Sequence, residues 1–157
     1  MHAPRILIVC GLAGAGKTTT AHRLAAARGG IRLCPDEWMR ALDIDLYEQP
    51  ARANIERLQW TLAQDLVRNG ISAIIEWGTW SRNERDDIRE WCRAKDIGVE
   101  LHFLDVPVDE LWERLRVRNE QPGEVVIPHF LLDHWANNAF EAPTPDELDQ
   151  FDAPLDE

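Results

Sequence analysis

The sequence is most constrained by a glycine-rich segment that separates an apolar run from a helix-favouring run. Residues 6–10 are all apolar, which is typical of a short strand buried on both faces. Residues 11–18 follow with the letters GLAGAGKT, and residues 21–27 then favour a helix. Because glycines permit backbone conformations that are closed to other residues, this order predicts a loop whose N–H groups turn inward around an anion.

The spacing GxxxxGKT within that segment is the phosphate-binding loop pattern. Lys17 is predicted to reach the β- and γ-phosphates of a nucleotide, and the Thr18 hydroxyl to join the coordination of Mg²⁺. A glycine-rich turn that meets the pattern by accident is the competing interpretation, and the flanking strand and helix argue against it. The residues expected to bind the nucleotide here are Gly11, Leu12, Ala13, Gly14, Ala15, Gly16, Lys17, Thr18 and Thr19.

Length and composition set outer limits on the protein. A chain of 157 residues with 45% hydrophobic content can bury one substantial core, so a single domain over residues 1–157 is expected. Residues 1–10 lack the features of a signal peptide, and no apolar run approaches the roughly 20 residues that span a bilayer. Cys10, Cys34 and Cys92 are widely spaced without a CxxC pair, which indicates reduced thiols in a cytoplasmic protein with no membrane partner.

The net charge of −11 makes some partners less expected than others. Proteins that bind nucleic-acid backbones need clustered Lys and Arg, so the acidic balance disfavours that class and favours a small-molecule substrate. Acidic residues gather toward the C-terminal end, so a local basic cleft elsewhere stays open. The oligomeric state cannot be read from the sequence.

Further strands and helices alternate along the chain. Strands are predicted at residues 31–34, 71–75 and 99–104, and helices from residue 37 onward, at 51–69 and at 84–94. The helix at 51–69 carries an apolar stripe of Ile55, Leu58, Leu62 and Leu66. This alternation predicts an α/β fold of three layers, with a parallel sheet flanked by helices and no convincing fifth strand.

Three acidic residues follow predicted strands, namely Asp36, Glu76 and Asp105. Ligands of such sheets bind beyond the carboxyl ends of the strands, so these carboxylates are expected to face the phosphate site together. Asp36 is predicted to orient or deprotonate an acceptor hydroxyl, or to cap a helix that begins at residue 37, and the two roles are compatible. Glu76 is predicted to support Mg²⁺ directly or through water.

The segment after Glu76 offers candidates for a substrate pocket. Trp77 and Trp80 flank a Gly-Thr pair and are predicted either to line that pocket or to fill the core. Arg85 is predicted to meet phosphate or substrate, with a solvated helix start as the alternative.

A pair of arginines suggests a lid over residues 114–128. Arg114 and Arg118 are four residues apart and therefore share a helical face, where planar guanidinium groups suit charge on a transferring phosphoryl group. The alternative is a set of surface ion pairs such as Glu110 with Arg114. A helix is expected over residues 125–135, and the polar tail at 143–157 is expected to wrap the surface.

Several of these segments together resemble a known family. The glycine loop, the Cys34-Pro-Asp36 turn, the strand ending in Glu76, the run from Arg114 to Asn119 and the stretch at 140–147 look like the predicted-kinase branch of P-loop NTPases. That branch is similar to chloramphenicol phosphotransferase, zeta toxins and the kinase half of polynucleotide kinase. The resemblance covers about residues 5–150.

The resemblance carries expectations about the site. It implies a five-strand kinase core, ATP with Mg²⁺, an acceptor-activating Asp36, lid arginines at 114 and 118, and a 140–147 stretch near the adenine. Many relatives have Asp, a small residue and Thr after the third strand, where this chain has Glu76-Trp-Gly. Lys17, Asp36, Arg114 and Arg118 are therefore the expected catalytic residues, and Arg114 also an expected nucleotide contact.

The expected activity is transfer of the γ-phosphate of ATP to a hydroxyl of a small molecule. Two alternatives stay open: a polynucleotide 5′-hydroxyl kinase or a zeta-toxin-like sugar-nucleotide kinase, and a nucleotide-binding regulatory module without catalysis. A binding module has no need of an acceptor base, so Asp36 distinguishes the last alternative from the others.

Overall fold

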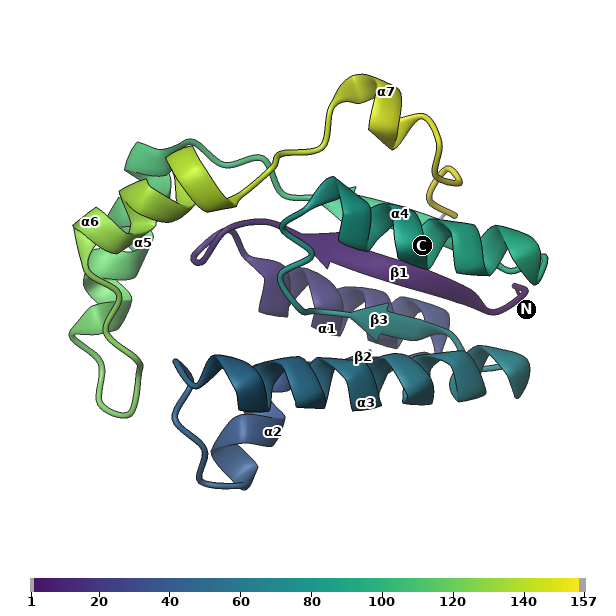
Figure 1. Cartoon of the computed structure of the whole chain (residues 1–157), viewed down its shortest axis with the longest axis horizontal. Helices are drawn as coiled ribbons and strands as arrows, with labels where there is room; N and C mark the ends of the chain where they lie inside the picture. The colour runs from purple at the N-terminus through teal and green to yellow at the C-terminus, as the bar shows by residue number, and fades with distance from the viewer. Residues whose placement is uncertain (1, 156–157) are drawn as a thin grey trace.

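A four-stranded parallel sheet with helices on both faces forms the centre of the protein (Figure 1). The computed structural model describes residues 2–155. The strands are β1 (Arg5–Cys10), β2 (Ile31–Leu33), β3 (Ala73–Ile75) and β4 (Gly98–Phe103), in the order β2-β3-β1-β4. The sheet places β1 between β3 and β4, and Ile8 of β1 lies opposite Ile75 on one side and Leu101 on the other. The predicted α/β architecture is confirmed, with shorter second and third strands than expected.

Some helices cover the faces of the sheet, and others lie beyond the ends of the strands. They are α1 (Lys17–Arg28), α2 (Pro35–Ala41), α3 (Gln49–Arg68), α4 (Arg82–Ala94), α5 (Val108–Asn119), α6 (His129–His134), the π-helical η1 (Trp135–Ala139) and α7 (Pro145–Leu148). Figure 1 shows α3 and α4 on one face of the sheet, α1 on the other, and α5 and α6 beyond the ends of the strands. Among the described residues, no helix is both long and apolar enough to cross a membrane.

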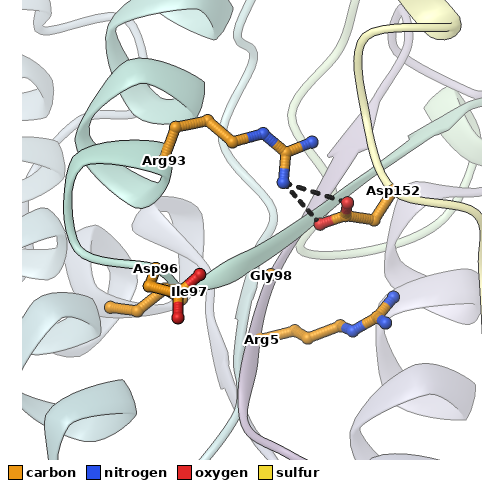
Figure 2. Close-up of a pocket in the computed structure, with 6 residues that line it drawn as sticks. All are labelled: Arg5, Arg93, Asp96, Ile97, Gly98 and Asp152. Carbon is orange, nitrogen blue, oxygen red and sulfur yellow. Dashed lines mark hydrogen bonds and ion pairs between the residues drawn. The ribbon is translucent and has the colours of Figure 1, made fainter.

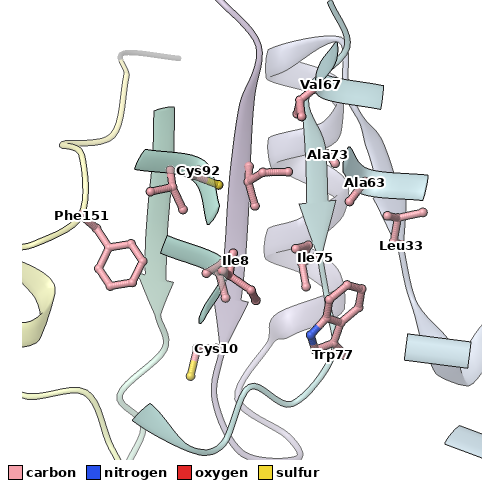
Figure 3. Packing of buried hydrophobic residues seen from close by; sticks show 13 residues of the cluster. Ile8, Cys10, Leu33, Ala63, Val67, Ala73, Ile75, Trp77, Cys92 and Phe151 are labelled. Atoms are coloured by element: carbon pink, nitrogen blue, oxygen red, sulfur yellow. The ribbon is translucent and has the colours of Figure 1, made fainter. Parts of the chain in front are cut away.

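Alternation along β1 divides the core into two halves. Ile6, Ile8 and Cys10 join the cluster under α3 and α4, which Figure 3 shows from close by. Leu7 and Val9 point to the other face and join a cluster with residues of α1. All five side chains are fully buried, as expected for the apolar run at residues 6–10.

The buried stripe of α3 differs from the predicted one. Leu58 and Leu62 are 52% and 36% exposed, so their predicted place in the core is wrong. The buried positions are Ile55, Gln59, Ala63 and Val67, which recur every four residues. The small Ala63 side chain lets the helix lie close to the sheet, so residue size, and not apolar spacing alone, selects the buried face.

The C-terminal segment packs into the core, whereas the sequence predicted that it would lie on the surface. The N–H of Asp152 donates to the backbone oxygen of Val99 at 2.9 Å, and Phe151 is buried in the main core. The segment thus lies against the outer edge of β4. Within residues 2–155 the sheet has four strands, so the five-strand core implied by the resemblance is not found. Residues 156–157 of the predicted tail lie outside the described residues.

Candidate functional site

The glycine loop joins the end of β1 to the start of α1. Gly14 and Gly16 have φ angles of 84° and 96°, in the left-handed region that other residues rarely adopt. A Cβ atom on Gly14 would also lie 3.2 Å from Leu115 Cγ. Glycine is therefore required at position 14 both by the backbone and by the close approach of α5. Leu12 and Ala15 bury their side chains in a cluster with Leu115, which leaves the loop backbone as the binding surface.

The ammonium group of Lys17 contacts the glycine loop and is influenced by charged side chains from several elements. Its Nζ donates to the carbonyl oxygens of Gly11 and Leu12 at 2.9 and 3.1 Å, so the ammonium lies against the loop. Burial lowers the pKa of Lys17, and the nearby Arg118 acts in the same direction, whereas the carboxylates of Glu76 and Asp36 oppose them. Side chains of α2, of α5 and of the residue that follows β3 therefore act electrostatically on one ammonium group.

Thr18 and Glu76 form the candidate metal-binding pair. The Thr18 hydroxyl donates a hydrogen bond to the Glu76 carboxylate, which is 7% exposed at the end of β3. Hard oxygen ligands of this kind suit Mg²⁺, which takes its remaining ligands from phosphates and water. The described residues contain no group of three or more His, Cys, Asp or Glu that could hold a metal ion. The pair fits a nucleotide-bound Mg²⁺ rather than an ion held by the protein alone.

Arg32 is a member of the site that the sequence analysis missed. Its guanidinium donates to Glu76 through Nη1 and to Glu37 through Nη2. Burial opposes the charge, but the hydrogen bonds to Glu37 and Glu76 raise the pKa of Arg32 above its ordinary value. Arg32 thereby fixes the orientation of Glu76. A cation within the second strand, four residues before Asp36, was the available signal.

Asp36 lies in the first turn of α2, not at its cap. The helix begins at Pro35 with Cys34 at the N-cap position, so the predicted helix start at residue 37 and the capping role of Asp36 are wrong. Proline suits the first helical position because its fixed φ is already helical, which moves the start back. The Asp36 side chain is 46% exposed, and its Oδ1 pairs with Arg52 Nη2 at 2.7 Å.

The two predicted lid arginines lie on α5 beside the glycine loop. Arg114 Nη1 donates to Gly14 O at 3.1 Å, and its Nη2 pairs with Glu110 at 2.6 Å. The predicted surface pair and the contact with the loop therefore coexist. Arg118 is partly buried, and its Nε is without a hydrogen-bond partner within the described part of the chain. Its charge lowers the pKa of Lys17, so the two cationic groups lie near one another.

The loop after α5 reaches the connection between α2 and α3. Asn119 donates to Ile127 O at 2.8 Å and accepts from Ile127 N at 2.9 Å, which ties the two ends of this loop together. Tyr47, from the α2–α3 connection, donates its hydroxyl to Val126 O at 2.9 Å. The helix that follows begins at His129, four residues later than predicted. The loop between α5 and α6 thus lies against the α2–α3 connection.

Two of the predicted substrate contacts belong to the packed interior instead. Arg85 is fully buried, and its three guanidinium nitrogens are bonded to Glu147 and to the carbonyl oxygens of Thr79 and Glu141. Both interpretations offered for Arg85, a phosphate contact and a solvated helix start, are therefore wrong. Trp77 is 8% exposed and lies in the core beside Ile75 (Figure 3), which contradicts a role as a pocket wall.

Trp80 and Asp105 are two further residues that were predicted to face the site. The Trp80 ring packs 5.3 Å from that of Trp135 and 6.4 Å from that of Phe140, in the cluster that joins the glycine loop to α5. Its contact with substrate stays a prediction. Asp105 follows β4 as expected but is exposed, whereas Asp36 and Glu76 act on Lys17.

Two surface cavities lie at the opposite end of the sheet. The first, of about 240 Å³, is lined by residues where β1 and β4 begin, and Figure 2 shows Arg93 turned toward Asp152 across it. Both oxygens of Asp152 accept from Arg93 Nη1 at 2.9 Å, so these charges anchor the C-terminal segment. A second cavity of about 330 Å³ adjoins the end of α1. Neither cavity includes the glycine loop.

The fold and the site together define a P-loop nucleotide-binding protein with a kinase-type fold. A family model described as an AAA domain matches residues 6–134, and the chain belongs to that family. No curated protein matches the sequence at a significant level.

Solved structures of kinases and of an RNA repair complex are similar to this chain. A chain of the Pnkp1/Rnl/Hen1 RNA repair complex has a TM-score of 0.72 and 22% identity, over 96% of this chain and 44% of that one. This chain therefore spans less than half of that relative. An unliganded sugar kinase from Janibacter sp. has a TM-score of 0.62 and 26% identity, over 92% of this chain and 82% of that one. The APS kinase CysC of Mycobacterium tuberculosis, in complex with AMPPNP and APS, has a TM-score of 0.55 and 20% identity, over 73% and 69%.

Proposed function

We propose that this protein is an ATP-dependent phosphotransferase that moves the γ-phosphate of ATP to a hydroxyl group of a small molecule. One arrangement carries the proposal: Lys17 lies against the glycine loop, the Thr18 hydroxyl is bonded to Glu76, and the partly exposed Asp36 carboxylate lies in the first turn of α2. A protein that only binds nucleotide needs the loop and a metal ligand. It has no need of an exposed carboxylate on the acceptor side.

The phosphate-binding part of the site follows from the loop. The loop backbone and Lys17 bind the phosphates, and the Thr18 hydroxyl with the Glu76 carboxylate holds Mg²⁺, which neutralises charge on the phosphate oxygens. Arg32 keeps Glu76 in place. The loop carbonyls that accept from Lys17 are weak partners for an ammonium group, so phosphate oxygens can replace them.

Asp36 acts on the acceptor. The acceptor oxygen attacks the γ-phosphorus while the bond to the β–γ bridging oxygen breaks, which releases ADP. The hydroxyl proton passes to the Asp36 carboxylate. Catalysis of this kind depends on position more than on basicity, because the transition state is loose and the nucleophile needs orientation. The exposed Asp36 on α2 supplies that orientation from the side facing Lys17.

Arg114 and Arg118 act from α5. The free Nε of Arg118 near Lys17 is available to bind oxygens of the transferring phosphoryl group. Arg114 holds α5 on the loop through Gly14 O and lies where it can contact the nucleotide. The loop between α5 and α6 covers the site and excludes water, which limits hydrolysis of ATP.

A small-molecule acceptor is favoured by the charges around Asp36. Glu84, Asp36 and Arg52 all act on the charge of Glu56, so three carboxylates and one cation lie in this region. Such a surface repels a polyanionic strand. The similarity to a chain of an RNA repair complex keeps a polynucleotide kinase as the second candidate.

A labelling screen tests this proposal. The protein is incubated with γ-labelled ATP and Mg²⁺ against separate pools of hydroxylated antibiotics, sugars, nucleosides and short oligonucleotides. Lys17→Ala serves as the inactive blank and Lys95→Ala, at an exposed lysine, as the matched control. Label on a small molecule, lost with Lys17→Ala and kept with Lys95→Ala, is the expected result. Label on oligonucleotide alone establishes the second candidate, and nucleotide binding without label in any pool contradicts a kinase.

A further inference from the structure

The cavity beside the last turn of α1 has the lining of a binding site. Its volume of about 330 Å³ lies at the lower end of the range of about 300–1,000 Å³ that is typical of small-molecule sites. The basic residues of the lining are His2, Arg5 and Arg28, and no Asp or Glu is among the lining residues that the structure describes. Apolar residues such as Leu7 and Leu155 form much of the remaining wall. The cavity thus combines positive charge with apolar surface.

Arg28 is the most buried of these basic residues. Its side chain is 4% exposed, and its Nη2 donates to the carbonyl oxygen of Leu155 at 2.6 Å. The same nitrogen lies 3.6 Å from the carboxylate of Glu100. Within residues 2–155, Nε and Nη1 of Arg28 are buried and have no hydrogen-bond partner. Because unpaired donors of a buried charged group are costly, an acceptor at these atoms would stabilise the protein.

The carboxylate nearest to Arg28 is shared with other groups. Glu100, which is fully buried on β4, accepts from Arg5 Nη1 at 3.0 Å and lies 2.8 Å from His102 Nε2. Burial alone would raise the pKa of Glu100, but His102 and the two arginines lower it, so the group is ionised and supplies a single negative charge. Two guanidinium groups therefore face one carboxylate, and one positive charge remains unbalanced.

The end of α1 does not replace the missing partner. Arg28 occupies the last turn of this helix, where the dipole corresponds to roughly half a negative charge. Such a dipole offsets part of the charge but gives Nε and Nη1 of Arg28 no acceptor atom. An oxyanion supplies both a whole negative charge and oxygens that accept charge-assisted hydrogen bonds.

We propose that this cavity binds a small organic anion, whose carboxylate or phosphoryl oxygens accept hydrogen bonds from Arg28. Ser72 lines the same cavity, and its Oγ accepts from the backbone N–H of Arg5 at 3.1 Å, which leaves the hydroxyl proton to donate to the ligand. The apolar part of the lining contacts the body of the ligand. The site is separate from the glycine loop and does not depend on the proposed kinase function.

Oxygens of this kind have two sources. One is a free organic anion. The other is the chain itself, because Leu155 lines the cavity and is followed in the sequence by the acidic Asp156 and Glu157, which lie outside the described residues. The recognition chemistry is the same in both cases, so the experiment has to distinguish them.

Nitrogen-15 NMR of the arginine Nε groups tests the site in the whole chain. The probes are inorganic phosphate and butyrate, each added at constant ionic strength. The Arg28 signal should shift to saturation, whereas the signal of the exposed Arg57 on α3 should stay in place. Lys17→Ala, which should lose phosphate binding at the glycine loop, is expected to keep the Arg28 response. A response that disappears in Lys17→Ala would belong to the loop and would overturn the proposal.

Two variants assign the binding to the cavity, with the backbone amide of Gly29 in the lining as the reporter. Arg28→Gln should weaken binding about tenfold, because charge-assisted hydrogen bonds are lost, and Arg57→Gln is the matched control that should leave it unchanged. Ala27→Leu, at an exposed lining position, keeps every charge but fills part of the cavity. It should also weaken binding, which keeps the test decisive if Arg28→Gln does not fold. Binding of wild-type strength in Ala27→Leu overturns the proposal.

The double variant Asp156→Asn with Glu157→Gln separates the two sources. If the terminal carboxylates occupy the site, the Arg28 signal should shift in this variant and the probes should bind more tightly than to the wild type. Equal affinity in the two proteins assigns the site to a free anion. No saturable response of Arg28 in either protein, or a parallel response of Arg57, overturns the proposal.

Discussion

Two arginine–carboxylate pairs in this protein are built in opposite ways. Arg85 and Glu147 are 0% and 1% exposed, and the guanidinium binds both carboxylate oxygens at 2.6 and 3.0 Å. Arg52 and Asp36 are 23% and 46% exposed and share one contact at 2.7 Å. The first pair joins α4 to the C-terminal segment, and the second joins two helices beside the phosphate site.

The difference separates a fixed contact from an exchangeable one. Arg85 also donates to the carbonyl oxygens of Thr79 and Glu141, so moving it would leave several buried groups without partners. Arg52 can leave Asp36 at little cost, because both side chains are partly exposed and water can solvate them. Changes at the phosphate site should therefore alter chemistry with little effect on stability, and changes at the buried pair should do the reverse.

The largest expected effect comes from Lys17→Ala. Removing the ammonium should lower ATP affinity about 10³-fold, because its charged contacts with phosphate are lost, while the thermal midpoint shifts by only a few degrees. Titration calorimetry and thermal unfolding measure the two quantities. A variant that binds ATP as the wild type does would contradict the assignment of the loop.

Glu147→Ala tests the other side of the comparison. It leaves the buried Arg85 charge uncompensated, so the free energy of unfolding should fall by about 3 kcal/mol, with ATP affinity unchanged below the melting temperature. Asp65→Ala, which removes an exposed pair with Arg68, is the control and should change little. Replacing both partners, Arg85→Met with Glu147→Leu, should recover only part of the stability, because the carbonyl oxygens of Thr79 and Glu141 then lose this donor. A stable Glu147→Ala protein would show that the pair does not hold the segment.

Arg118→Ala should lower kcat about 10²-fold with a smaller effect on ATP affinity, because this guanidinium is proposed to act on the transferring group. Arg116→Ala is the matched control on the same helix, since Arg116 is exposed and pairs with Glu113 at 2.9 Å. Steady-state kinetics distinguish the two. Equal losses from both variants would assign the effect to α5 as a whole rather than to Arg118.

The smallest effect concerns stability and pH at Glu56. Its pKa is raised from the ordinary 4.5 to about 7, so the folded state keeps a proton that the unfolded state has released between these values. Stability should therefore fall as pH rises from about 4.5 to about 7. Glu56→Gln removes that loss and should be more stable than the wild type by about 1 kcal/mol at pH 8, after allowance for solvent screening. Near pH 4 the two should be equal, and a constant difference at all pH values would contradict the shifted pKa.

The parts of the fold that depend on neighbouring residues were predicted from the sequence. The loop at residues 11–18 needs its own glycines, Lys17 and the flanking apolar strand, and the structure places them as expected. The carboxylates of Asp36 and Glu76 were also placed at one edge, because the carboxyl ends of parallel strands meet there.

The parts of the fold that depend on partners far along the chain were not predicted from the sequence. The sequence predicts a ligand contact for Arg85 because its partner, Glu147, lies 62 residues further along, in a segment with the composition of a polar surface tail. Leu58 and Leu62 fit a helical stripe, but the side of α3 that meets the sheet is decided by the sheet. Local patterns do not carry such information.

Arg52 and Arg32 were missed for a related reason. An arginine near a helix start or inside a short strand looks like a solvated charge unless its carboxylate partner is known. The sheet brings Arg32 of β2 to Glu76, which follows β3, and the packing of α3 against α2 brings Arg52 to Asp36.

The central claim is that Asp36 activates an acceptor at a nucleotide site that binds ATP without it. The most direct measurement compares label transfer and ATP affinity in Asp36→Asn and in Asp43→Asn, whose exposed position has a φ of 56° that asparagine tolerates. Asp36→Asn should lower transfer about 10³-fold and leave the Kd for ATP within about threefold, with Asp43→Asn unaffected. Transfer at the wild-type rate in Asp36→Asn would contradict the account.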